Sequence, residues 1–231
     1  MSELLKVSGL WGGYKEGVDI LRGIDMTVQE KEAVGIIGLN GSGKSTLGKA
    51  IMNMSPFRKG TIEFDGEDIT DLSTCELARK GLAIMQQGGQ VFQNLSIWEN
   101  LEIAFANGSS LEQIRDIIPL LQRSKRELQY QMADKLSGGQ KHQLALAMAL
   151  ATEPKLVILD EPSAGLSPAS IREMYMILRD LRIQLGATII LIEQSIASAV
   201  NFCDRSLLIR LGVSTEIHED DILKGIESMM F

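Results

Sequence analysis

The chain is poor in cysteine, histidine and aromatic residues. Only two of its 231 residues are cysteines, Cys75 and Cys203, and they lie far apart in the sequence. Neither stands at a metal-ligand spacing from His142 or His218, so we expect both histidines to be ordinary surface or core residues. Two isolated thiols fit a reduced intracellular protein better than a secreted one held together by disulfides.

Long apolar runs and a surplus of positive charge are also missing. No uninterrupted apolar run approaches the roughly 20 residues that a membrane-spanning helix needs, and the N-terminal residues lack the pattern of a secretory signal. The formal net charge is −7 and the isoelectric point about 5.0. An acidic chain is a poor candidate for nucleic-acid binding, because affinity for the phosphate backbone comes from clustered Lys and Arg. We therefore expect a cytoplasmic protein with no nucleic-acid partner, which meets a membrane only through other subunits.

The first seventy residues are rich in short β patterns. Strands are predicted at 4–7, 19–21 and 23–28, with a break at Gly12-Gly13. A hairpin is predicted over 60–69, because Asp65-Gly66 is a typical two-residue turn between alternating side chains.

From residue 34 onward, apolar strands alternate with helical segments. Three short runs are apolar or nearly so, as in strands buried on both faces: 34–37, 156–159 and 188–192. A further strand is predicted at 82–85. Helices are predicted at 44–54, 97–132, 137–152 and 170–185. The second of these is divided at Asn107-Gly108-Ser109-Ser110 and interrupted by Pro119, and the last ends at Gly186. Strands joined through helices predict a parallel sheet, so we interpret residues 1–231 as one α/β domain with a helical insertion at about 88–150.

The segment that follows the strand 34–37 matches a phosphate-binding loop at every constrained position. Its nine residues are Gly38, Leu39, Asn40, Gly41, Ser42, Gly43, Lys44, Ser45 and Thr46. The glycines let the backbone curl so that its N–H groups face a phosphate, and a helix N-terminus adds partial positive charge. Lys44 can reach the β- and γ-phosphates and Ser45 can bind Mg²⁺. The pattern predicts an ATP site with Lys44 as a catalytic contact.

Two acids end the strand 156–159. Asp160 and Glu161 lie at the carboxyl end of that strand, where parallel sheets bind ligands. Asp160 is predicted to hold Mg²⁺, and Glu161 to act as the general base for the attacking water. A surface strand can also end in two acids without a function, so the phosphate-binding loop is what makes this prediction strong.

A third motif, Leu136-Ser137-Gly138-Gly139-Gln140, precedes Asp160 by 20 residues and opens the helix at 137–152. With this pentapeptide in this order the chain resembles the ABC ATPases. The resemblance implies a P-loop NTPase core with a mostly parallel sheet, an N-terminal antiparallel β-subdomain and a helical signature subdomain. It also implies that the signature residues, Ser137, Gly138, Gly139 and Gln140, close over the γ-phosphate held by a second subunit. Alone, the motif would read as a helix N-cap and turn.

The resemblance extends to further positions along nearly the whole chain. Tyr14 stands where the family places an aromatic residue that stacks on adenine, although a half-buried strand tyrosine is equally compatible with the sequence. Gln87 matches the glutamine that contacts Mg²⁺ and relays movement to a membrane subunit, and Gln86 leaves the register open by one. Residues 163–168 match the loop that couples the two ATP sites.

The chain departs from the family at two positions. Ser167 replaces an aspartate, and Gln194 replaces a histidine near the end of the strand 188–192. Glutamine can hydrogen-bond a γ-phosphate or water but carries no positive charge. The pair Glu193-Gln194 and the loop Gly165-Leu166-Ser167-Pro168 resemble one ATPase of the branched-chain amino acid uptake systems, and similar importers of urea or amides.

The sequence therefore predicts an ATP-hydrolysing motor subunit of an ABC importer, with ATP and Mg²⁺ as cofactors and Glu161, Gln194 and Lys44 as catalytic residues. Its implied partners are a second ATPase subunit, paired head to tail, and transmembrane permease subunits. The chain itself is expected at the inner face of the cell membrane. Residues 88–100 are expected to line the permease groove, with Phe92, Leu95 and Trp98 as an apolar patch or as core. A soluble ABC ATPase of the cofactor-assembly type and a weakly hydrolysing regulatory cassette are the alternatives.

Overall fold

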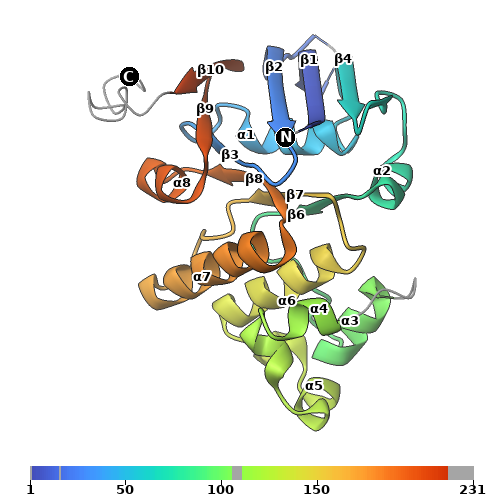
Figure 1. Ribbon diagram of the computed structural model, residues 1–231, viewed down its shortest axis with the longest axis vertical. Helices are drawn as coiled ribbons and strands as arrows, with labels where there is room; N and C mark the ends of the chain where they lie inside the picture. The colour runs from blue at the N-terminus through green and yellow to red at the C-terminus, as the bar shows by residue number, and fades with distance from the viewer. Residues whose placement is uncertain (1, 16, 106–110, 218–231) are drawn as a thin grey trace. The chain divides into compact units, whose positions relative to one another are not determined.

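The computed structural model describes residues 2–15, 17–105 and 111–217 of the chain (Figure 1). It divides into two compact units. Unit 1 comprises Met1–Leu77 and Thr188–Phe231, and unit 2 comprises Ala78–Ala187. The predicted insertion at 88–150 lies inside unit 2, and the single-domain interpretation stays a prediction. His218 and the terminal methionines lie outside the described residues.

Unit 1 contains an antiparallel sheet in the order β2-β1-β4-β5. Its strands are β1 (Glu3–Gly13), β2 (Leu21–Gln29), β4 (Phe57–Phe64) and β5 (Glu67–Asp68). The β4–β5 hairpin is confirmed, because Asp65 and Gly66 both have positive φ, 52° and 76°, as a tight primed turn requires.

The predicted break at Gly12-Gly13 is wrong. β1 runs through both glycines, and they pair with β4 at Arg58 and Phe57. Their role is close approach, because a Cβ on Gly13 would lie only 2.2 Å from the carbonyl oxygen of Val18. Glycine here makes room for the returning chain and does not end the strand.

Unit 1 also holds four strands in the order β10-β9-β3-β8. β3 (Ala33–Ile37) is parallel to both β8 (Thr188–Glu193) and β9 (Arg205–Arg210), while β10 (Val213–Ile217) runs antiparallel to β9. Every residue of β3 and β8 is buried, as their apolar sequences predicted. Helix α8 (Ile196–Phe202) packs on β3 and β8, and α1 (Lys44–Ile51) packs on β1 and β8. Helix α2 (Thr74–Lys80) lies at the boundary between the two units in the sequence.

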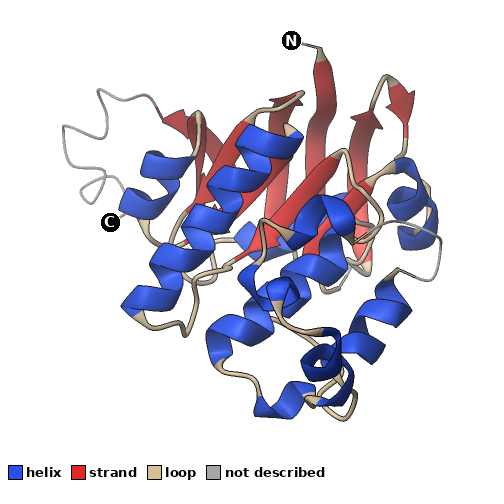
Figure 2. Cartoon of the chain, turned by 60° about the horizontal axis from the view of Figure 1, so that its bottom comes forward, coloured by secondary structure: helices blue, strands red, loops and turns tan. Residues whose placement is uncertain are grey.

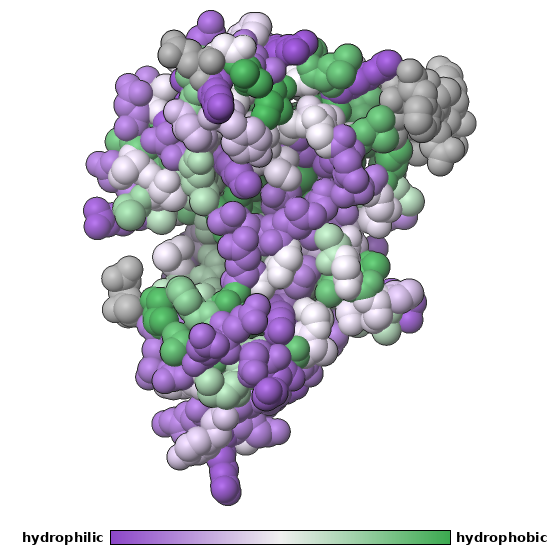
Figure 3. Space-filling view, turned by 180° about the vertical axis from the view of Figure 1, so that it is seen from behind, coloured by the Kyte–Doolittle hydropathy of each residue, from purple (hydrophilic) through white to green (hydrophobic). Residues whose placement is uncertain are grey.

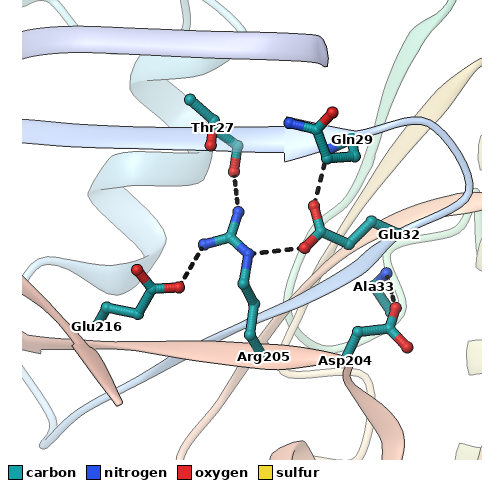
Figure 4. A network of polar contacts seen from close by, with 7 residues as sticks. All are labelled: Thr27, Gln29, Glu32, Ala33, Asp204, Arg205 and Glu216. Atoms are coloured by element: carbon teal, nitrogen blue, oxygen red, sulfur yellow. Dashed lines mark hydrogen bonds and ion pairs between the residues drawn. The ribbon is translucent and has the colours of Figure 1, made fainter. Parts of the chain in front are cut away.

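Arg205 joins β9 to three neighbouring segments of unit 1 (Figure 4). Its Nε donates to Glu32 Oε1 at 2.7 Å and its Nη1 to Glu216 Oε1 at 3.2 Å, and Nη2 donates to the carbonyl of Thr27. Burial lowers the pKa of Arg205, but the carboxylates of Glu32 and Glu216 more than offset this, so the pKa is raised overall. Asp204 adds a hydrogen bond of 2.7 Å from the backbone N–H of Ala33. These contacts hold the β3 strand in register with its neighbours.

Unit 2 is built on the parallel pair β6 (Leu82–Met85) and β7 (Leu156–Asp160). Helix α6 (Gly138–Leu150) packs against β6 and also contacts α3, α7 and the short 3₁₀ segment η1 (Figures 1 and 2). The remaining helical segments are α3 (Ile97–Ala104), α4 (Glu112–Arg115), η1 (Pro119–Gln122), α5 (Lys125–Tyr130), η2 (Ala133–Lys135) and α7 (Pro168–Leu185).

The predicted helices of unit 2 are recovered, with the segment 97–132 divided into shorter pieces than expected. Ser96 and Ser124 begin α3 and α5 through capping boxes with Glu99 and Glu127. These capping boxes satisfy N–H groups that would otherwise have no partner, which allows helices as short as α5 to form. The predicted divider at 107–110 lies outside the described residues.

One face of the molecule is largely polar. Figure 3 shows one face on which hydrophilic side chains predominate and apolar ones form small separate groups. Within the described residues, no helix combines the length and the apolar character that crossing a membrane requires.

Candidate active site

The loop after β3 has the backbone that the phosphate-binding motif requires. Gly38, Gly41 and Gly43 have φ values of 155°, 78° and 111°, all in the region that favours glycine. A Cβ on Gly38 would lie 2.4 Å from the carbonyl oxygen of Ile209, so that position also excludes any larger residue on steric grounds. The loop therefore curls between β3 and α1 as the sequence predicted.

Lys44 lies folded over this loop. Its side chain is 4% exposed, and its Nζ donates to the carbonyls of Gly38 at 2.8 Å and Leu39 at 3.0 Å. These bonds hold the ammonium group inside the curl of the loop. No acidic residue occupies the first turn of α1, so the positive N-terminus of that helix is not offset there.

Ser42 supports the fit of this loop to a phosphate. Its Oγ is buried and makes no hydrogen bond within the described part of the chain. Buried hydroxyls are normally satisfied, and an unsatisfied one in a functional loop is explained when a ligand supplies the missing partner. A bound phosphate offers such acceptor oxygens, so Ser42, the glycines and Lys44 together fit an anion.

The other predicted residues of unit 1 are found near the same sheet edge or on the surface. Ile37 pairs with Glu193, so Gly38 and Gln194 are the first residues beyond two paired parallel strands. Gln194 is exposed, while Glu193 is 3% exposed. Tyr14 follows the end of β1 and is 58% exposed, so the half-buried strand alternative is wrong and its ring is available to a ligand.

The two acids of unit 2 end the buried strand β7. Asp160 is its last residue and is 2% exposed, and Glu161 is 5% exposed. Glu161 has a φ of 49°, in the left-handed region that a non-glycine residue rarely adopts. Strained backbone of this kind often occurs at functional sites, because the surrounding structure must hold it.

Gln87 contacts Glu161 directly. Met85 pairs with Leu159 at the ends of β6 and β7, and two residues further on Gln87 Nε2 donates to Glu161 Oε2 at 2.6 Å. Gln86, which left the register open in the sequence, instead lines a groove with residues of α6. The geometry therefore favours Gln87 as the residue that acts with Glu161.

The signature motif forms the start of α6. Ser137 is the N-cap: its Oγ accepts from the N–H of Gln140, and its own N–H donates to Gln140 Oε1. Both Ser137 and Gly138 are exposed, whereas Gly139 is buried and has Ser170 close to its missing Cβ, at 2.9 Å. The motif is thus a helix N-cap, the role that it would have without any function in ATP binding. It also presents an exposed, glycine-lined helix N-terminus.

Ser167, one of the two departures from the family, has a clear local role. Its Oγ accepts from the N–H of Ser170 at 3.3 Å, which makes it the N-cap of α7, with Pro168 in the first turn. Aspartate and serine are both favoured N-caps. The replacement therefore keeps the helix start and removes only the negative charge.

His142 is a core histidine, one of the two roles that the sequence predicted for it, and it is 4% exposed. Its Nδ1 lies 2.7 Å from the carbonyl oxygen of Pro162, a contact that was not predicted. Pro162 directly follows Glu161. The sequence offered no signal for this contact, because it joins α6 to a turn 20 residues further along the chain.

The candidate Mg²⁺ ligands are chemically suited to that ion. Ser45, Asp160 and Gln87 offer only oxygen donors of the kind that Mg²⁺ prefers, and nucleotide phosphates and water usually complete its shell. Within the described residues there is no cluster of three or more His, Cys, Asp or Glu side chains that could hold a metal ion by itself. The residues present fit a metal that arrives with a nucleotide better than a resident one.

Comparison with known proteins gives the family. The protein-family model described as ABC transporter matches residues 21–164, which is more than half of the chain. The chain belongs to the ABC transporter family. It is an ATP-binding protein and an ATPase of that family, and its fold is the P-loop ABC fold that the motifs implied.

The curated relatives are transport ATPases. The high-affinity branched-chain amino acid transport ATP-binding protein BraG of Pseudomonas aeruginosa is 33% identical over 86% of each chain. The probable branched-chain amino acid transport ATP-binding protein LivF of Archaeoglobus fulgidus is 35% identical over 90% of this chain and 89% of that protein. The lipopolysaccharide export system ATP-binding protein LptB of Escherichia coli is 30% identical over 96% of this chain and 95% of its own.

A solved structure agrees with the fold. The ADP conformation of MJ1267, an ATP-binding cassette of an ABC transporter, matches with a TM-score of 0.82 and 26% identity. The match covers 99% of this chain and 96% of that one.

Proposed function

We propose that this chain is the motor subunit of an importer of branched-chain amino acids or similar small polar solutes. The hydrogen bond between Gln87 and Glu161 is the observation that supports a motor role, because it joins a predicted coupling residue to the predicted base. The substrate class rests on similarity to the proteins named for branched-chain amino acid transport. The pair Glu193-Gln194 resembles the same subgroup.

The proposed chemistry divides between the two units. In unit 1 the loop 38–46 binds the ATP phosphates, Lys44 neutralises the γ-phosphate, Tyr14 stacks on adenine and Gln194 hydrogen-bonds the γ-phosphate or the attacking water. Asp160 and Gln87 of unit 2 and Ser45 of unit 1 are the residues that would hold Mg²⁺, and Glu161 would take the proton of the attacking water. When bound, Mg²⁺ would neutralise charge that develops on the phosphate oxygens. The exposed signature N-terminus at Ser137 would act on the nucleotide of a second, head-to-tail subunit.

A groove in unit 2 supports a permease partner. It is lined mainly by apolar residues and has a volume of about 390 Å³; its lining is Ile84, Met85, Gln86, Gln90, Val91, Phe92, Ala145, Met148 and Ala149. Phe92 is 51% exposed, so a partner could contact its side chain. An apolar helix of a transmembrane permease would fill the groove, which would place the chain on the cytoplasmic face of the cell membrane.

The apolar patch expected around Phe92, Leu95 and Trp98 is not one surface. Leu95 and Trp98 are half-buried and neither lines the groove. The ring of Trp98 donates from Nε1 to Glu102 and lies under the ammonium group of Lys125. Only residues 90–92 of the predicted segment 88–100 line this groove.

A transport assay in the native host tests the proposal. Deletion of the gene should abolish uptake of labelled leucine or isoleucine, and the wild-type gene should restore it while a Lys44→Ala gene does not. Normal uptake in the deletion strain would refute the substrate class.

The similarity to LptB makes lipid export the second candidate. In that case the deletion strain should keep amino acid uptake and lose transport of an envelope lipid. Recovery of the protein away from membranes would instead favour a soluble cassette, and wild-type turnover near background would favour a regulatory one.

A further inference from the structure

We propose that His142 is a positioning residue for ATP hydrolysis, which ties the loop after Gln87 to the turn after Glu161. The inference rests on the proposed roles of Glu161 and Gln87. All the residues that carry it belong to unit 2.

The first contact is between the imidazole and the Gln87 loop. Gly89 has a φ of 59°, and a Cβ built on it would lie 2.4 Å from His142 Cδ2 and 3.1 Å from Cγ. Non-bonded carbon atoms do not approach this closely, so only glycine fits against the ring. The backbone of the loop therefore rests directly on His142.

The second contact is with the turn that follows the base. His142 Nδ1 lies 2.7 Å from the carbonyl oxygen of Pro162. A carbonyl can only accept, so the hydrogen must be on Nδ1. Pro162 follows Glu161, whose left-handed backbone needs support from its surroundings. The hydrogen bond fixes the peptide next to that strained residue.

The two contacts act in parallel with a third. Gln87 Nε2 donates to Glu161 Oε2 at 2.6 Å, which joins the same loop to the same turn directly. The ring of His142, packed on Gly89 and hydrogen-bonded to Pro162, fixes the backbone at both ends of this hydrogen bond and so holds the Glu161 carboxylate in one orientation.

A fixed carboxylate matters because general-base catalysis depends on geometry. A displacement of about 1 Å of a catalytic group can lower turnover by roughly 100-fold without changing how tightly the ground state binds. Both of these contacts of His142 are to backbone beside the proposed Gln87–Glu161 pair, at Gly89 and at Pro162, so its loss should act on kcat. A buried histidine that only fills the core would instead act on stability.

The experiment compares His142→Leu with His142→Asn in the full-length protein, and uses steady-state ATPase kinetics and thermal unfolding. Leucine fills the space but cannot donate, whereas asparagine carries its amide nitrogen on Cγ, as histidine carries Nδ1. We expect His142→Leu to lower kcat by about 10- to 100-fold with KM for ATP changed by less than about twofold. His142→Asn should return kcat to within about threefold of wild type.

A mutant cycle with Gln87→Ala tests whether the effect passes through the Gln87–Glu161 contact. In the wild-type background, His142→Leu lowers log kcat by a certain amount. In the Gln87→Ala background, the same substitution should lower log kcat by less than half of that amount. Additive effects would overturn the proposed route.

Three further results would overturn the inference. The first is a kcat of His142→Leu equal to that of the wild type. The second is an equal loss of kcat in His142→Leu and His142→Asn, in proportion to the loss of thermal stability in each variant. The third is a ¹⁵N NMR spectrum of the wild-type protein that shows the hydrogen on Nε2 alone, which can be read even if the Leu variant does not fold. A wild-type rate no higher than that of Lys44→Ala would refute the proposed function itself, and the inference with it.

Discussion

Gln87 Nε2 donates a hydrogen bond of 2.6 Å to Glu161 Oε2, and this bond joins the loop after β6 to the turn after β7. It occupies Oε2 of the proposed base. Any movement of the Gln87 loop would therefore turn or release the carboxylate. That is the behaviour expected of a contact through which a permease could control hydrolysis.

The first prediction concerns the base. Glu161→Gln should lower ATPase turnover by about 100-fold or more, because an amide cannot take a proton from water. Its Oε1 can still accept from Gln87, so the loop should stay in place and ATP should still bind. Size-exclusion chromatography with ATP and Mg²⁺ should show a stable dimer, trapped before hydrolysis. A monomer under saturating ATP would contradict the in-trans role of Ser137 in a homodimer.

The second prediction concerns Lys44. Lys44→Ala should abolish ATP binding, measured by titration with a fluorescent nucleotide, because the loop loses its charged contact. Lys44 is also buried and donates to two loop carbonyls. Thermal stability should therefore fall by roughly 1–3 kcal/mol as well. Unchanged nucleotide affinity would contradict the assignment of the loop.

The buried strands could be predicted from the sequence because each is a short apolar run that ends at a recognisable motif. β6 lies at the predicted residues 82–85, and β3, β7 and β8 are found within one residue of prediction at each end. β9 and β10 were not predicted. The apolar run Leu207–Ile209 is short and lies between Ser206 and Arg210. Arg205, at the start of β9, is paired with Glu32, which is far away in the sequence, and with Glu216 in the adjacent strand.

The motifs of the site were also visible in the sequence, whereas the contacts between them were not. Glycine spacing indicates a phosphate loop because only glycine adopts the required φ, and that reasoning needs no partner residue. The contacts Gln87–Glu161 and His142–Pro162 join positions 74 and 20 residues apart. They arise from strand register and from helix packing, which no local pattern encodes.

The third prediction concerns the Arg205 network. Arg205→Met should lower the free energy of unfolding by about 1–3 kcal/mol, because Glu32 would be left largely buried without its partner. Lys6→Met is the matched control: its ion pair with Glu63 is 3.8 Å long and exposed on both sides, so the change should stay under about 1 kcal/mol. Urea unfolding followed by circular dichroism measures both. Equal effects would mean that the Arg205 contacts add nothing beyond surface charge.

The fourth prediction separates two adjacent glycines. Gly88 and Gly89 both have positive φ, 84° and 59°, so alanine at either position carries a similar backbone strain of about 1 kcal/mol. At Gly88 the added methyl group meets nothing within 4 Å, but at Gly89 it meets the His142 ring. Gly89→Ala should therefore lower both the melting temperature and ATPase turnover clearly more than Gly88→Ala. Similar losses in the two variants would show that the ring contact is unimportant.

The last prediction concerns Gln194, where the family usually has histidine. Gln194 directly follows Glu193, which pairs with Ile37 just before the phosphate loop, and its side chain is exposed at that edge of the sheet. Glutamine and histidine both present an N–H donor at similar reach, whereas alanine presents none. Gln194→Ala should lower ATPase turnover by about 100-fold, the usual loss for one hydrogen bond made in the transition state. Gln194→His should be tolerated, and ATP affinity should change little in either variant because Lys44 and the loop backbone hold the ground state. Steady-state kinetics of the three proteins, with the permease present, measure this, and equal rates in wild type and Gln194→Ala would remove Gln194 from the mechanism. If the wild-type rate were then also close to background, the weakly hydrolysing regulatory cassette would become the better description of the chain.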